Sequence, residues 1–110
     1  MIEKQSLTVL GRDQLAAASA SNGRSAHTVY GGHEQILRQT LLALTAGSAL
    51  EEHDSPGEAT LIVLQGQVLL TSAAATWDGA AGDHLIIPTT RHGLTAIEDS
   101  VVLLTVAKPQ

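Results

Sequence analysis

The run of residues 47–66 constrains the fold of this chain more than any other stretch. His53 follows the opening Gly47 after five residues, a Pro56-Gly57 pair comes next, and a short apolar segment then leads to Gly66. Short apolar segments bounded by glycine and proline are typical of β-strands joined by tight turns. The run therefore predicts strands on both sides of the Pro56-Gly57 turn.

The rest of the chain continues this rhythm of short apolar segments separated by Gly, Asp and Pro. Such spacing indicates an all-β barrel or sandwich rather than alternating helices and strands. Strands are expected at residues 26–30, 60–65, 68–71, 76–77, 84–87, 93–97 and 101–107, with a turn region at 78–83. Residues 60–65 and 68–71 are expected to form a hairpin about Gly66-Gln67.

Two further segments need separate treatment. Residues 34–45 fit a helical stripe as well as a buried strand, and the short spacing to Gly47 favours the strand. Near the N-terminus, a weak alternation predicts an edge strand at residues 6–10. Asp13 is then expected to cap a short helix at residues 14–19.

Composition limits the function classes. A chain of 110 residues forms one domain. Its net charge of −5 and its lack of basic runs argue against a surface that binds nucleic acid or an anionic membrane, so neither partner is expected. With no cysteine, disulfide and thiolate chemistry are excluded. Because the start resembles no signal peptide and no stretch reaches membrane-spanning length, we expect a soluble, cytoplasmic protein.

The run from Gly47 to Gly66 resembles the first motif of the cupins, G-x5-H-x-H-x3,4-E-x6-G. His53 stands at the first histidine of this motif, Ser55 at the second, and Ala59 at the glutamate. The two glycines and the first histidine of the motif are present, whereas its second histidine and its glutamate are replaced.

Residues 82–92 resemble the second cupin motif, G-x5-P-x-G-x2-H-x3-N. Gly82 and Pro88 have the expected separation, and His92 corresponds to the metal-binding histidine of the motif, after a loop one residue shorter. Thr90 replaces the glycine and Ala96 the asparagine.

The resemblance implies an all-β, double-stranded β-helix barrel of two antiparallel sheets, preceded by a short N-terminal helix. A single cupin domain would occupy residues 1–110, with its motif-bearing core at 34–107 and an N-terminal extension at 1–25. Cupins commonly pair through edge strands, so the resemblance also implies a homodimer, with the N-terminal segment as a candidate pairing element.

The cupin metal site normally uses three histidines and one glutamate, and this chain supplies two of the four. Three interpretations stay open. His53, His92 and Glu58 form a site for one divalent transition metal (Fe, Mn, Ni or Zn); or there is no metal, and the two histidines bind a polar ligand or act as acid and base; or they are bonded only to backbone or water.

Strand alternation bears on the third ligand. Ala59 should share the inward face with Leu61 and Val63, which turns Glu58 to the opposite face unless a bulge beside the Pro56-Gly57 turn rotates it inward. Ser55 should share the face of the nearby His53, where its neutral hydroxyl would be a poor metal ligand.

Other polar and aromatic residues carry weaker predictions. Arg91, beside His92, is a candidate ligand-binding residue that could pair with a carboxylate, although a solvated loop charge is favoured. Surface, packing or loop roles are favoured for the remaining histidines, which are His27, His33 and His84. The acidic residues near His53 are expected to form a solvated rim: Glu51, Glu52 and Asp54. The two large aromatic rings, Tyr30 and Trp77, are expected to cover the core.

Two functions follow from these patterns. The first is a barrel that binds an unknown small molecule in a pocket containing His53 and His92, with a degenerate metal site. The alternative is a metal-dependent enzyme of small-molecule metabolism, of dioxygenase or isomerase type, that uses two histidines and one carboxylate.

Overall fold

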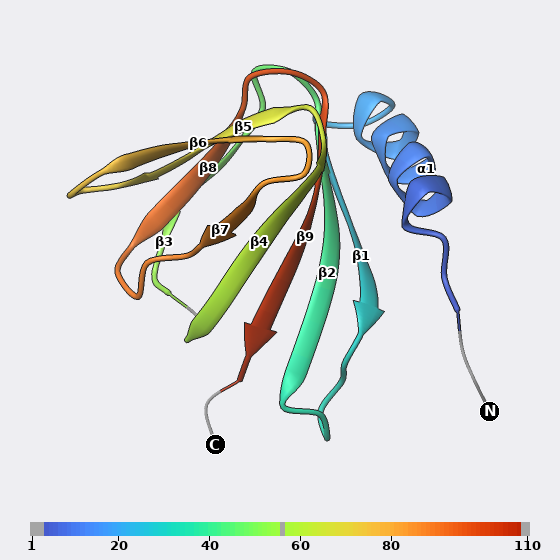
Figure 1. Ribbon diagram of the computed structural model, residues 1–110. Helices are drawn as coiled ribbons and strands as arrows, with labels where there is room; N and C mark the ends of the chain where they lie inside the picture. The colour runs from blue at the N-terminus through green and yellow to red at the C-terminus, as the bar shows by residue number, and fades with distance from the viewer. Residues whose placement is uncertain (1–3, 56, 109–110) are drawn as a thin grey trace.

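The computed structural model describes residues 4–55 and 57–108 of the chain. Within these ranges it contains one helix and nine strands arranged as two sheets (Figure 1). In chain order the elements are α1 (Leu7–Ser19), β1 (Arg24–Tyr30), β2 (Leu37–Leu44), β3 (Ala49–His53), β4 (Glu58–Gln65), β5 (Gln67–Ser72), β6 (Thr76–Ala80), β7 (His84–Ile86), β8 (His92–Ala96) and β9 (Ser100–Ala107).

The nine strands form a five-stranded sheet and a four-stranded sheet that face each other. The five-stranded sheet has the order β1-β2-β9-β4-β7, and the four-stranded sheet has the order β3-β8-β5-β6. The paired strands are antiparallel. This arrangement confirms the expected all-β fold of two antiparallel sheets, and the ambiguous segment at 34–45 contributes strand β2.

The core fills the space between the two sheets with aliphatic side chains. Along β4, Ala59, Leu61 and Val63 are buried while Glu58 is exposed, so the predicted facing of this strand is correct. The buried cluster consists of Leu44, Ala59, Leu61, Val63, Val68, Leu70, Ile87, Leu94, Ala96, Val102 and Val106. Tyr30 and Trp77, which were expected to cover the core, are 51% and 39% exposed.

The predicted hairpin between residues 60–65 and 68–71 is wrong. Strand β4 pairs with β7 and β9, whereas β5 pairs with β6 and β8. Gly66, at a φ of 87°, carries the chain from one sheet to the other. The turn is held by the β8–β9 connection instead, because Ile97 N–H donates to the Gln67 carbonyl (2.8 Å) and Gln67 N–H donates to Ser100 Oγ (3.1 Å).

The N-terminal predictions also need correction. Residues 7–10 are helical, so the expected edge strand is wrong, and α1 is longer than the predicted helix. Ser6 caps the helix, since its hydroxyl accepts a hydrogen bond from Val9 N–H (3.2 Å), and Asp13 lies inside it. The weak alternation of polar and apolar residues did not reveal this cap, because a serine before a helix also fits the start of a strand.

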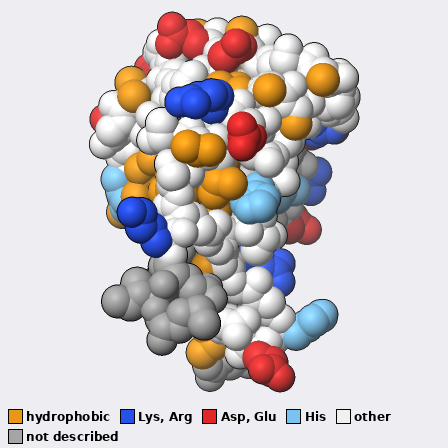
Figure 2. Space-filling view, turned by 90° about the vertical axis from the view of Figure 1, so that its right-hand side faces the viewer, with side chains coloured by type: hydrophobic (Ala, Val, Ile, Leu, Met, Phe, Trp, Pro, Cys, Tyr) orange, Lys and Arg blue, Asp and Glu red, His pale blue; other side chains and the backbone are white. Residues whose placement is uncertain are grey.

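Helix α1 covers the outer face of β1 and β2 (Figure 1). Leu41 and Ala43 alternate with side chains that face the inter-sheet core, yet both are fully buried, which places them under the helix. Gly11 of α1 packs against Val101 of β9, where an added Cβ would lie 3.1 Å from a valine methyl carbon. On the face seen in Figure 2, hydrophobic side chains lie among charged ones.

Strand β6 runs to Ala80 and so includes part of the predicted turn region at 78–83.

No helix within the described ranges is both long and apolar enough to cross a membrane. The homodimer and the cytoplasmic location stay predictions from the sequence.

Candidate functional site

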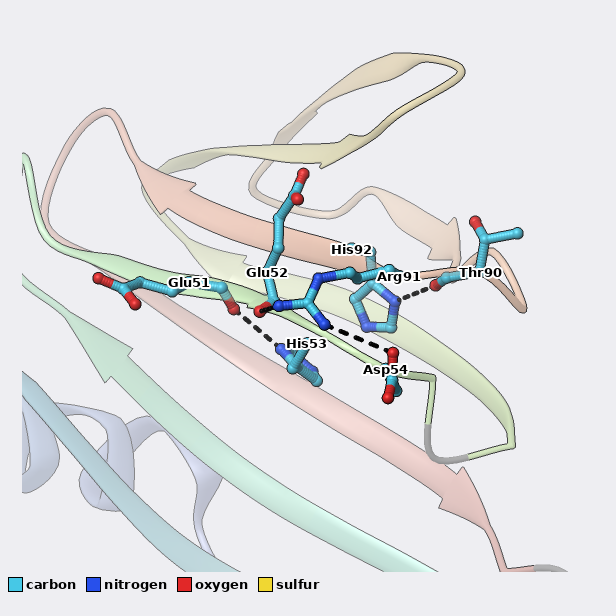
Figure 3. A network of polar contacts seen from close by, with 7 residues as sticks. All are labelled: Glu51, Glu52, His53, Asp54, Thr90, Arg91 and His92. Carbon is cyan, nitrogen blue, oxygen red and sulfur yellow. Dashed lines mark hydrogen bonds and ion pairs between the residues drawn. The ribbon is translucent and has the colours of Figure 1, made fainter.

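His53 and His92 meet at one end of the four-stranded sheet. The two residues are direct partners across β3 and β8, and their ring centroids lie 4.6 Å apart at an interplanar angle of 63° (Figure 3). His92 is buried, at 5% exposure, whereas His53 is exposed at the rim. The structure thus brings together the two histidines that the motifs singled out.

A β-bulge in β3 makes this meeting possible. The pairing with β8 is regular at Leu50↔Leu94 and next resumes at His53↔His92, so Glu51 and Glu52 together face a single residue of β8, Gly93. Leu50 packs against the core. In a regular strand, a residue three positions later would point to the opposite face. The extra residue of the bulge returns His53 to the face of His92.

Gly93 leaves the space that the bulge needs. An added Cβ on this residue would lie 3.1 Å from the Leu50 carbonyl oxygen and 3.3 Å from the Glu52 amide nitrogen. Most real Cβ contacts are longer than this. A glycine next to the motif histidine was the one sequence signal that could have revealed the close approach of β3, and the sequence interpretation did not use it.

Backbone carbonyls fix the orientation of both rings. His53 Nδ1 lies 3.0 Å from the Glu51 carbonyl oxygen, and His92 Nδ1 lies 2.9 Å from the Thr90 carbonyl oxygen. Because a carbonyl can only accept, the facing nitrogen of each ring carries the proton. In this tautomer of a neutral imidazole the lone pair lies on Nε2, where it can accept from a hydrogen-bond donor or bind a metal ion.

Arg91 lies at the rim of the histidine pair, where its guanidinium contacts β3 (Figure 3). Its Nη2 donates to the Glu52 carbonyl (3.0 Å), and its Nη1 lies 3.5 Å from Asp54 Oδ1. The Arg91 and Asp54 side chains are 61% and 93% exposed. Arg91 therefore pairs with Asp54, a carboxylate of this chain, at the exposed rim.

The structure does not bring Glu58 to the histidine pair. Glu58 is exposed on the face of β4 opposite Ala59. The Pro56-Gly57 turn, which was expected to allow a bulge there, includes Pro56, a position outside the described residues. Ser55 is engaged in its own loop, because its hydroxyl donates to the Gly57 carbonyl (3.0 Å).

These residues do not complete a metal site of the usual kind. Divalent transition metals in proteins ordinarily take three or four side-chain ligands. No group of three or more His, Cys, Asp or Glu side chains with metal-binding geometry occurs in the described part of the chain. The histidine pair contributes two nitrogens.

The other predicted residues lie elsewhere. His84 shares the exposed face of β7 with Ile86, as predicted, His33 is exposed in the β1–β2 connection, and His27 is half-buried on β1. Three acidic side chains around His53 are exposed, as expected for a solvated rim: Glu51, Glu52 and Asp54.

Solved structures share this architecture. A conserved protein of unknown function from Streptococcus pyogenes is 27% identical over 100% of this chain and 90% of that one, with a TM-score of 0.77. An RmlC-like cupin protein from Desulfovibrio desulfuricans is 26% identical over 81% of this chain and 86% of that one, with a TM-score of 0.70. This chain folds as a small cupin domain.

The cupin fold is also shared with an enzyme. Salicylate 1,2-dioxygenase from Pseudoaminobacter salicylatoxidans matches 91% of this chain, with a TM-score of 0.75, 17% identity and a coverage of 33% of the enzyme. At this identity the likeness concerns the fold alone. No protein-family model and no curated protein matches the sequence.

Proposed function

We propose that this cupin domain binds a small molecule that donates hydrogen bonds to Nε2 of His53 and of His92. The observation that carries the proposal is the shared arrangement of the two rings. They lie 4.6 Å apart, and in both of them Nδ1 faces a backbone carbonyl. Acceptor nitrogens on two rings this close together suit hydroxyl or amine groups of one ligand.

The surroundings of the pair support polar recognition through these two rings. The core cluster is aliphatic, and the buried His92 imidazole is a polar group that can orient a ligand next to it. His92 is buried and His53 is exposed beside it, so in this proposal a ligand enters past His53 toward His92. A ligand that reaches His92 would also contact His53.

The alternative function is a metal-dependent enzyme of dioxygenase or isomerase type. Two observations favour it: the match to the fold of salicylate 1,2-dioxygenase, and the Nδ1–carbonyl contacts, which are typical of metal-ligating histidines. The exposed position of Glu58 opposes it, because the described residues then offer two ligands. The binding function is therefore the better supported one.

Thermal-shift screening of the purified protein against polyols, amines and carboxylic acids tests the proposal. A ligand that stabilises the protein should lose its effect in His53→Ala and in His92→Ala. It should keep its effect in His84→Ala, a matched control because His84 is exposed on β7 in the other sheet.

Elemental analysis after reconstitution with Fe, Mn, Ni and Zn distinguishes the two functions. We expect metal well below one equivalent in the wild-type protein and in the histidine variants. A stoichiometric metal that is lost in both His53→Ala and His92→Ala would overturn the proposal in favour of the enzyme.

A further inference from the structure

Arg91 contacts the residues on both sides of His53. Its guanidinium donates to the carbonyl of Glu52, which precedes His53, and pairs with the carboxylate of Asp54, which follows it. Along its own chain Arg91 directly precedes His92. One side chain therefore links the buried histidine to the segment that carries the exposed one (Figure 3).

The segment around His53 has few other restraints. Strand β3 is an edge strand that pairs with β8, and the bulge interrupts this pairing between Leu50 and His53. Residues 51–54 are exposed, so core packing does not fix them. An edge segment that contains a bulge can take more than one course, because the ladder is locally disrupted there. The bonds from Arg91 act at this point.

We propose that Arg91 is a positioning residue, which holds the β3 bulge so that the His53 ring stays against the His92 ring. It acts through His53 rather than by contact with a ligand. This role rests on the proposed function only in that the histidine pair is the binding site. A planar guanidinium can present two donors in a fixed geometry to a carbonyl and a carboxylate, which a lysine ammonium cannot reproduce.

Nuclear magnetic resonance of the isotopically labelled, ligand-free protein tests this role directly. In the wild-type protein we expect a nuclear Overhauser effect between the two imidazole rings, since their centroids are 4.6 Å apart. In Arg91→Ala this signal should fall by more than half, and Arg91→Lys should not restore it. Asp54→Ala, which removes one of the two contacts, should give a smaller loss.

A second measurement uses the ring-current effect of one imidazole on the other. Replacing His92 by Ala should move the ring-proton resonances of His53 in the wild-type background. The same replacement should move them by less than half as much in the Arg91→Ala background. This difference reports ring placement, which a general loss of stability would not change in a folded protein.

Arg24 supplies the matched control. It is also an exposed arginine that donates to a backbone carbonyl of β3, that of Ala49 (3.5 Å), but at the other end of the strand. Arg24→Ala should leave the inter-ring signal unchanged. Thermal unfolding of each variant identifies any that fail to fold, in which case Asp54→Ala and Arg91→Lys carry the test.

A full inter-ring signal in folded Arg91→Ala would overturn the positioning role. So would a variant with unchanged rings that binds a screened ligand more weakly, because Arg91 would then be a ligand contact. The ring measurements need no ligand. A failed ligand screen therefore counts against the proposed function and leaves the placement of His53 by Arg91 to be decided separately.

Discussion

The two ends of strand β8 are built in different ways. At the turn end, formed by Gly66, Gln67, Glu98 and Ser100, the Ser100 hydroxyl is buried and contacts both polar backbone groups of Gln67 (3.1 Å each). At the histidine end, formed by residues 51–54 and 90–93, the bulge is exposed and held by Arg91. We therefore expect substitutions at the turn end to lower the free energy of unfolding, and substitutions at the histidine end to affect ligand binding.

The largest effect is expected from Gly66→Ala at the turn end. Gly66 has a φ of 87°, and a Cβ there would clash with the Asp99 carbonyl oxygen and with Ser100. Backbone strain and overpacking together should lower the free energy of unfolding by roughly 3 kcal/mol in urea titrations. Gly47→Ala is the control, since Gly47 also has a positive φ but an added Cβ would meet nothing within 4 Å. Equal losses in both variants would refute the contribution of crowding.

Ser100→Ala should have the second largest effect. Its removal leaves the partly buried N–H of Gln67 without its acceptor, which should cost about 1 to 2 kcal/mol of unfolding free energy. Chemical denaturation measures the loss, and Ser72→Ala, at a half-buried serine that ends β5, is the comparison. If both substitutions cost the same, the turn end would have no special place in stability.

Gly93→Ala tests the histidine end by pushing β3 away from β8. The contacts of 3.1 and 3.3 Å to the β3 backbone should cost about 1 kcal/mol, the lower end of overpacking effects. The inter-ring signal between His53 and His92 should weaken as well. An unchanged signal would show that the bulge tolerates a larger residue at this position.

The smallest effects on stability are expected from Arg91→Ala and His53→Ala. Both side chains are exposed, so each change should alter the free energy of unfolding by about 0.5 kcal/mol or less. Urea unfolding of the two variants beside the wild type checks this. A loss as large as that of Ser100→Ala would remove the contrast between the two ends.

The sequence determined the parts of this protein that depend on local pattern. The alternation of β4 correctly placed Ala59 inward and Glu58 outward, because successive strand residues point to opposite faces. The two motifs singled out His53 and His92, which the fold brings side by side, and the turn signals separated most of the strands. The N-cap at Ser6 was missed, because a weak alternation favoured a strand there.

Tertiary structure decided what depends on partners distant in the chain. Gly66 is compatible with a hairpin or with a change of sheet, and its packing against the β8–β9 connection selects the second. Likewise, strand period alone does not return His53 to the face of Leu50. The bulge opposite Gly93 does so, because its geometry comes from the pairing of β3 with β8, some 40 residues away in the sequence.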